Sequence, residues 1–345
     1  MALKIKDSRL VGTIDNLEEK LEGKLPVTRE ELLVLVNTHG RFERSYINTY
    51  PNIIIEKYNA NECYDLSKLD TSEITNMDYV FSKSYFNDNI SNWDTSKVTT
   101  MKSMFYQAMN FNQDIGNWNV SNVTNMSSMF MGAVDFDQDI GKWDVSNVTN
   151  MEDMFRITRS FNYPLNSWNV SKVTNMSYMF SNTSEFNQDI GKWDVSNVTN
   201  MESMFDKAIN FNKDISNWDV SKVKDMNCMF YSARVFNQDI SKWDVSNVTD
   251  MNSMFMGARG FSQDISKWNI SKECFLKDVF NNAKAFIDKY NNGVDIPYHT
   301  EDFKIWFDNN KDRMNDLDIK DRYGNQINDF FSNIKGADNG IKNRK

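Results

Sequence analysis

The chain has 345 residues, of which 39 are basic and 48 acidic, so its formal net charge at pH 7 is −9. Hydrophobic residues make up 40% of the sequence and aromatic residues 13%, which is too apolar for an intrinsically disordered protein. The acidic balance argues against binding to nucleic acid or anionic lipid, and no apolar run approaches the ~18 residues of a membrane span.

Residues 1–62 precede a repeat array and are predicted to form an N-terminal capping segment. This segment lacks the apolar core of a signal peptide, so we expect no secretory signal. Thr28 is suited to cap a helix over residues 28–36, whose first turn carries two glutamates. Three isoleucines at residues 53–55 predict a short buried strand. A separate docking module is the alternative to a cap.

A unit of 25 residues then repeats along the chain, and we assign residues 63–285 to this array. The unit is F-N-Q-D-I-x-x-W-D-V-S-N-V-T-N-M-x-x-M-F-x-x-A-x-x. A degenerate copy with Leu69 in the tryptophan position precedes eight copies that carry Trp93, Trp118, Trp143, Trp168, Trp193, Trp218, Trp243 and Trp268. No single unit can bury its aromatic and methionine side chains, so we expect stacked units to bury them as columns.

The period lies within the 20–29 residues of leucine-rich repeats, and Ile115, Trp118 and Val120 follow their L-x-x-L-x-L spacing. A strand would place Trp118 and Val120 on one face and Asn119 on the other. We therefore predict a repeat solenoid of the leucine-rich-repeat class. It would be a right-handed β-solenoid or horseshoe with a parallel sheet and small helix-containing caps at both ends.

Residues 286–345 leave the repeat and are predicted to form a C-terminal helical cap and a polar tail. Thr300, two acidic residues and the apolar residues Phe303 and Phe307 are typical of a capped amphipathic helix. We expect this helix to close the far end of the sheet. The last ten residues, GADNGIKNRK, are polar and are expected to be disordered.

The repeated W-D-V-S-N-V-T-N-M-x-x-M-F block resembles the 25-residue repeat of BspA-like leucine-rich-repeat proteins, a bacterial group. The resemblance implies a non-enzymatic protein-binding scaffold that uses the curved face of a solenoid for surface adhesion or for contact with host or matrix proteins. It supplies no catalytic residues. The alternative is an intracellular adaptor, immunity or effector-type protein. Cell surface, secreted and cytoplasmic locations all stay open.

The position after each tryptophan is the first candidate for a protein-binding surface, because a strand would expose it on the concave face. Its carboxylates repel one another unless they are neutralised, and the lysines just before four of the tryptophans (Lys142, Lys192, Lys242 and Lys267) are expected to do so. Two interpretations of this column stay open: an electrostatic patch that binds a basic partner, and a solvated strand face whose charges compensate one another. The residues are Asp94, Asn119, Asp144, Asn169, Asp194, Asp219, Asp244 and Asn269.

One repeat departs from the pattern, and non-uniformity in a uniform array marks a candidate contact. Residues 156–165 read RITRSFNYPL, which gives Arg156, Arg159 and Tyr163 as candidate contact residues. Ordinary sequence drift is the alternative interpretation.

A second acidic column comes from the F-N-Q-D block: Asp114, Asp139, Asp189, Asp214, Asp239 and Asp264. Calcium binding is disfavoured because the spacing of a calcium loop is absent, and we predict that these residues cap turns. Recurrent Ser and Asn columns are predicted to form hydrogen-bond ladders.

Catalysis and bound cofactors are not expected. Cys63, Cys228 and Cys274 are odd in number and lack metal-site spacing, so neither a disulfide framework nor a metal ion is predicted. The only histidines are His39 and His299, so groups for acid–base chemistry are scarce. An enzyme would need a site at one end of the chain, around His39 with Glu43 or His299 with Asp302.

Overall fold

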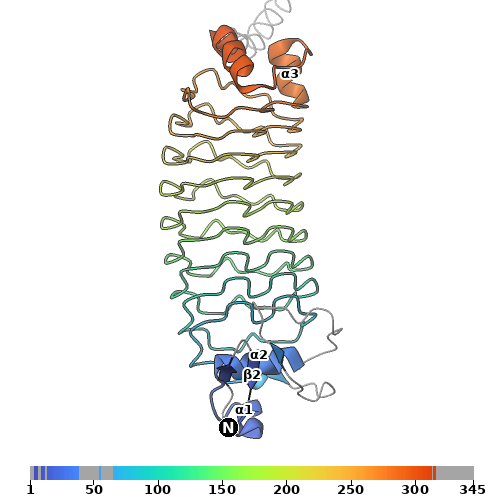
Figure 1. Ribbon diagram of the computed structural model, residues 1–345, viewed down its shortest axis with the longest axis vertical. Coiled ribbons are helices and arrows are strands. Elements are labelled where there is room, and N and C mark those ends of the chain that lie inside the picture. Colours follow the sequence, from blue (N-terminus) through green and yellow to red (C-terminus); the bar gives the residue numbers. More distant parts are fainter. Residues whose placement is uncertain are drawn as a thin grey trace, which may run out of the picture.

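A computed structural model describes residues 4–6, 9–11, 14–38, 54–55, 65–312 and 314–315 of the chain. The repeat region forms a tall stack of coils, where each coil is one 25-residue turn of the chain (Figure 1). The N-terminal elements lie at one end of the stack and helix α3 at the other (Figure 1). His39, Glu43, Cys63 and the last ten residues lie outside the described residues.

Consecutive coils are joined by backbone hydrogen bonds along the N-M-x-x-M-F part of the unit. The amides of Met126, Ser128, Phe130 and Gly132 donate to the carbonyls of Asn150, Glu152, Met154 and Arg156 in the next coil at 2.7–3.1 Å. Isolated parallel bridges run in the same place, through Asn76, Thr100, Asn125, Asn150, Asn175, Asn200, Asp225, Asp250 and Phe275. Within residues 65–312 no strand is longer than such a bridge, so the strand predicted at Trp118–Val120 is wrong.

Trp118–Val120 is not a strand because turns enclose it on both sides, closed by hydrogen bonds from Trp118 N to Ile115 O at 3.1 Å and from Val123 N to Val120 O at 2.9 Å. The part of the unit that bonds the next coil also turns instead of extending. Ser128 and Gly132 have φ values of 56° and 74°, and the equivalent positions of the other coils are also left-handed. Two turns are closed by hydrogen bonds of 3.2 Å, one from Met129 N to Met126 O and the other from Met131 N to Ser128 O. Left-handed residues interrupt any extended run. In the irregular repeat one such position holds the β-branched Ile157, at a φ of 62°.

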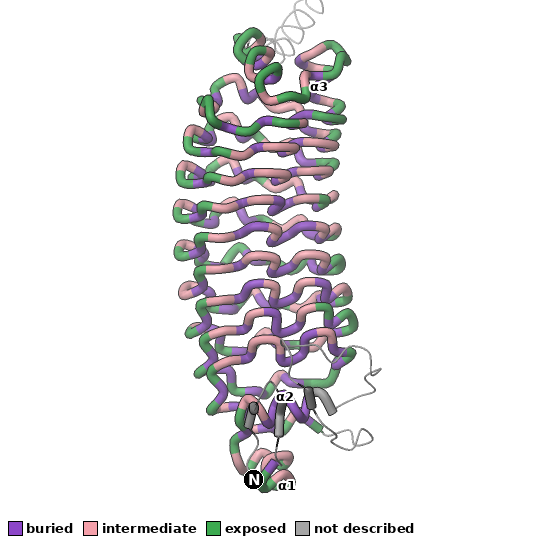
Figure 2. Tube along the Cα trace, in the orientation of Figure 1, coloured by how far each residue is buried: buried purple, intermediate pink, exposed green. Residues whose placement is uncertain are grey.

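Aromatic columns fill the interior of the stack, where Figure 2 shows buried residues on every coil. The rings of Phe105 and Phe130 lie 5.5 Å apart and nearly parallel. Each indole N–H in the tryptophan column donates to a carbonyl of the preceding coil, as Trp118 Nε1 does to Ile90 O at 3.1 Å. The predicted burial of the Trp, Phe and Met columns is confirmed.

Polar side chains bond the backbone where the coils bend. Asp114 Oδ1 accepts from Gly116 N at 2.9 Å, and each of the other five members of this column likewise accepts from the amide two residues later. Asn122 Nδ2 donates to Ser96 O of the preceding coil at 2.7 Å. The predicted turn capping is therefore confirmed. The predicted asparagine column also satisfies the backbone where the coils bend, since Asn125 Oδ1 accepts from Ser127 N at 2.9 Å. The predicted serine column differs, because Ser121 Oγ bonds Asn119 Oδ1 of its own coil at 2.7 Å.

The N-terminal end contains a three-stranded sheet and two helices. Strands β1 (Lys4–Lys6) and β2 (Arg9–Val11) are antiparallel, and β2 pairs in parallel with β3 (Ile54–Ile55). Helix α1 spans Leu17–Leu21 and α2 spans Arg29–Thr38.

Thr28 caps α2 as predicted. Its Oγ1 accepts from Glu31 N at 3.3 Å, and Thr28 N donates to Glu31 Oε2 at 2.9 Å, which is a capping box. Arg29 Nη2 donates to Asp78 O at 3.0 Å and so joins α2 to the first coils. A 3₁₀ turn, η1 (Leu66–Lys68), leads into the stack.

The C-terminal end is covered by α3 (Lys284–Asn291) and by a helix over residues 300–312. The second helix was predicted, but the role of Thr300 differs. Thr300 Oγ1 accepts from Leu276 N at 3.1 Å and so satisfies an amide of the last coil, while Phe303 N donates to His299 O. No described helix has the length and apolarity that crossing a membrane requires.

Candidate binding surface

The residues that follow the tryptophans form an exposed column along the stack, which we name the acidic ribbon: Asp94, Asn119, Asp144, Asn169, Asp194, Asp219, Asp244 and Asn269. The ribbon lies at a bend, because each of the first seven side chains accepts a hydrogen bond from the serine amide two residues later. Asp194 Oδ1, for example, accepts from Ser196 N at 3.1 Å. The ribbon is therefore a row of Asx turns instead of the predicted strand face.

These turns keep the ribbon carboxylates ionised. Hydrogen bonds from the serine side chains, and then from the serine amides, lower the pKa of Asp94, Asp144, Asp194, Asp219 and Asp244. The negative charge of Asp219 opposes this by raising the pKa of both Asp194 and Asp244. The three carboxylates therefore stand on consecutive coils and repel one another.

The predicted neutralisation by lysines just before the tryptophans is wrong. In residues 65–312 no ion pair joins a ribbon carboxylate to a lysine or arginine. The lysines whose charge reaches the ribbon lie one residue after its serines, and each is bonded elsewhere. Lys97 pairs with Glu73, and Lys172 and Lys222 donate to Asn147 and Asn197 of the preceding coil, all at 2.7 Å. The ribbon thus has no ionic partner within the described chain.

The three candidate residues of the irregular repeat are not brought together. Arg156 pairs with Asp153 at 3.2 Å, and its guanidinium lies 4.6 Å from the ring centre of Tyr178. In the described part of the chain no side-chain contact joins Arg156 to the exposed residues Arg159 and Tyr163. Arg156 therefore belongs to a network within the stack, which the sequence did not reveal.

That network continues over the next coils. The Tyr178 hydroxyl donates to the Glu202 carboxylate, and burial together with this bond raises the pKa of Tyr178 to about 12. This network could be predicted from the sequence only by aligning the repeats, because its members lie about one repeat apart in the chain.

Comparison with known proteins places the repeat in a family. A family model described as "Mycoplasma protein of unknown function, DUF285" matches residues 52–168, 134–227, 187–294 and 210–319. The chain belongs to this family. No curated protein matches the chain. The overlapping DUF285 matches identify a repeat protein, and they contain the whole acidic ribbon.

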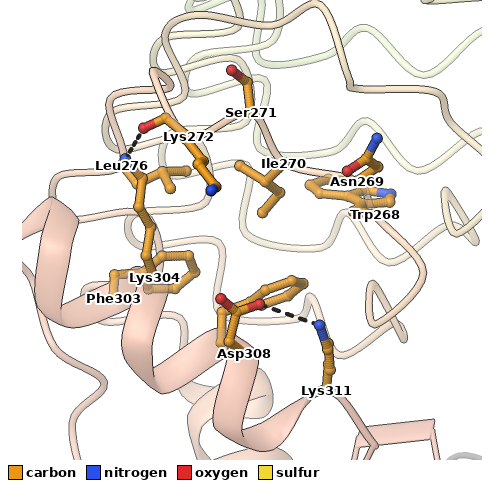
Figure 3. A pocket seen from close by; sticks show the side chains of 11 residues that line it. Trp268, Asn269, Ile270, Ser271, Lys272, Leu276, Phe303, Lys304, Asp308 and Lys311 are labelled. Atoms are coloured by element: carbon orange, nitrogen blue, oxygen red, sulfur yellow. Dashed lines mark hydrogen bonds and ion pairs between the residues drawn. The ribbon is translucent and has the colours of Figure 1, made fainter.

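One cleft of this DUF285 protein lies between the last coil and the helix over residues 300–312, and has a volume of about 140 Å³ (Figure 3). Trp268, Phe303 and Phe307 contribute apolar walls, and the ribbon residue Asn269 lies at its side. Two of its lysines have partners. Lys304 donates to Lys272 O, and Lys311 pairs with Asp308 at 3.3 Å. The cleft thus lies where the C-terminal helix over residues 300–312 meets the last coil of the stack.

The described DUF285 residues contain no group of three or more His, Cys, Asp and Glu that could hold a metal ion. Burial raises the pKa of the Cys228 thiol to about 11 and that of Cys274 to about 12. Both thiols are protonated at neutral pH and are therefore poor nucleophiles. The ring of His299 packs against the ring of Tyr298, with the two ring centres 4.2 Å apart.

Asp206 is a charged residue inside the polar network, and its removal is expected to stabilise the protein. Its Oδ2 accepts from Ser181 Oγ at 3.2 Å, whereas its buried Oδ1 has no hydrogen-bond partner and only a long ion pair with Lys207 Nζ at 3.9 Å. Burial raises the pKa of Asp206, so the folded state binds a proton more tightly than the unfolded state. Asp206→Asn should raise the free energy of unfolding at pH 7 by about 1 kcal/mol.

Chemical denaturation of both proteins checks this expectation. The advantage of the variant should shrink as the pH falls, because the wild-type carboxyl becomes protonated in the folded state. Asp214→Asn is the control, since hydrogen bonds from Ser216 lower the pKa of this exposed turn cap. A greater gain for Asp214→Asn than for Asp206→Asn would contradict the assignment.

Proposed function

We propose that this protein is a non-enzymatic scaffold whose acidic ribbon binds a basic segment of a protein partner. The observation that carries the proposal is the state of Asp194, Asp219 and Asp244, which are exposed, ionised and without ionic partners on consecutive coils. Cationic side chains would relieve their mutual repulsion. Because hydrogen bonds within each coil and between coils already fix the surface, binding would require little reorganisation.

We also infer that the stack is a leucine-rich-repeat solenoid of the BspA-like type. The 25-residue period and the W-D-V-S-N-V-T-N-M-x-x-M-F block support this. On that resemblance, the partner is a host, matrix or neighbouring-cell protein met at the cell surface.

Replacement of three ribbon residues tests the binding proposal. Asn119 and Asn169 cap the same turn as the ribbon aspartates, so the triple variant Asp194→Asn, Asp219→Asn, Asp244→Asn removes charge and retains the caps. Binding of a fluorescent oligolysine peptide to the full chain is measured by anisotropy. We expect wild-type binding that weakens with salt, and loss of binding in the variant.

The matched control is the triple variant Asp189→Asn, Asp214→Asn, Asp239→Asn, which makes the same change of net charge on the same three coils, five residues before each ribbon aspartate. It should retain binding. Equal losses in the two triple variants would show that only net charge matters and would reject the ribbon as the site.

A further inference from the structure

Arg234 and Arg259 occupy the same repeat position in consecutive coils. The position follows the alanine of the unit and holds Met109, Val134, Arg159, Ser184, Ile209, Arg234, Arg259 and Lys284 along the stack. Gly260 N donates to Arg234 O at 2.9 Å, which joins the two coils at this point. The two arginine backbones are therefore neighbours, and their like charges lie on one surface of an acidic protein.

Neither guanidinium is neutralised by the protein. Both arginines are exposed, and within the described chain no carboxylate lies within ion-pair distance of either one. Other cations of the stack do have partners. Arg156 pairs with Asp153, and Lys284 pairs with Asp288 at 2.6 Å. Two adjacent cations without a counter-charge are an arrangement that a bound anion would stabilise.

A pocket of about 260 Å³ opens between these coils, and its lining contains no carboxylate: Tyr231, Ser232, Arg234, Met256, Gly257, Arg259 and Asn282. The two guanidiniums, two hydroxyl groups and an amide supply hydrogen-bond donors. Gly257 has a φ of +72°, and a Cβ there would lie 2.9 Å from Ser232 Oγ. The glycine thus fits the left-handed turn and leaves this side of the pocket open.

We propose that this pocket binds the phosphoryl group of a phosphate monoester between Arg234 and Arg259. A dianionic phosphoryl group has three terminal oxygens, so it can accept hydrogen bonds from both guanidinium groups and neutralise both charges. A carboxylate carries one charge and is satisfied by a single guanidinium. Tyr231 and Met256 supply apolar surface for the group that carries the phosphate. The site is separate from the acidic ribbon.

Calorimetric titration of the full chain with phenyl phosphate tests the proposal. Arg234→Gln and Arg259→Gln should each weaken binding at least about tenfold, because each removes one charged donor pair. The matched control is Arg159→Gln, an exposed arginine at the same repeat position whose column neighbours are Val134 and Ser184. It should bind as the wild type does, and thermal unfolding should show that all three variants remain folded.

Further ligands distinguish the class and the source of the anion. Benzoate, which presents a carboxylate on the same ring, should bind at least about tenfold more weakly than phenyl phosphate. Tighter binding of a phosphotyrosine peptide would identify a phosphorylated protein as the source, and equal binding would identify a small phosphate ester. The proposal is overturned if phenyl phosphate does not bind, if benzoate binds equally well, or if Arg159→Gln loses as much affinity as Arg234→Gln.

Discussion

Trp193→Ala is expected to lower the free energy of unfolding by about 3–5 kcal/mol. The indole is only 3% exposed and lies parallel to Trp168, with ring centres 6.4 Å apart. Its ring centre lies 6.2 Å from that of Phe180, and its Nε1–H donates a hydrogen bond to Leu165 O at 3.0 Å. Alanine would leave a cavity between two coils and a carbonyl without this donor.

Urea denaturation, followed by circular dichroism, measures the loss. Trp193→Phe is the matched variant, because it retains an aromatic ring and removes only the N–H and part of the volume. It should cost about 1–3 kcal/mol, less than the alanine variant. A change below about 1 kcal/mol for Trp193→Ala would contradict the interior position of the tryptophan column.

Phe303→Asp should open the C-terminal end of the stack. Phe303 is 1% exposed on the helix over residues 300–312, and its ring lies 5.9 Å from Phe280 of the last coil. An aspartate there would bury a charge or force the helix away, at a cost of about 4–5 kcal/mol. The uncovered coil would then present apolar surface and unpaired backbone groups, so we expect aggregation.

Light scattering after size-exclusion chromatography detects that aggregation, and urea denaturation gives the loss of stability. Ile305→Asp provides the control, since it introduces the same charge on the same helix at a residue that is 62% exposed. The control should remain monodisperse if the parent protein is. Equal behaviour of the two variants would show that the helix does not close the stack.

The parts of the fold that depend on side-chain burial could be predicted from the sequence. The spacing of Trp193 and its equivalents indicated an aromatic interior, and Thr28 marked the start of α2. The strand at Trp118–Val120 could not be placed correctly, because two apolar residues separated by one polar residue suit a bend as well as a strand. Left-handed residues such as Ser128 and Tyr178 carry no distinctive sequence signal, since neither is glycine.

The candidate surface was predicted in part. The D-x-S spacing at Asp194 is that of an Asx turn, which exposes the aspartate as a strand face would. The partners of the lysines depend on the register between coils, and Lys172 bonds Asn147 of the preceding coil. Aligning the units predicts that Arg234 and Arg259 lie on adjacent coils. It does not predict that they lack a neighbouring carboxylate, because that depends on how the side chains lie on the folded surface.

The hydrogen bonds between coils have a consequence for how such a gene can change. Thr124 N bonds Thr99 O, Asn122 Nδ2 bonds Ser96 O and Trp118 Nε1 bonds Ile90 O, and the same offsets recur along the stack. Insertion or deletion of one complete unit therefore lets every such bond form again with a new neighbour. Copy number can thus set the distance between the two caps, and unequal recombination between the repeats would lengthen or shorten the molecule without redesigning either end.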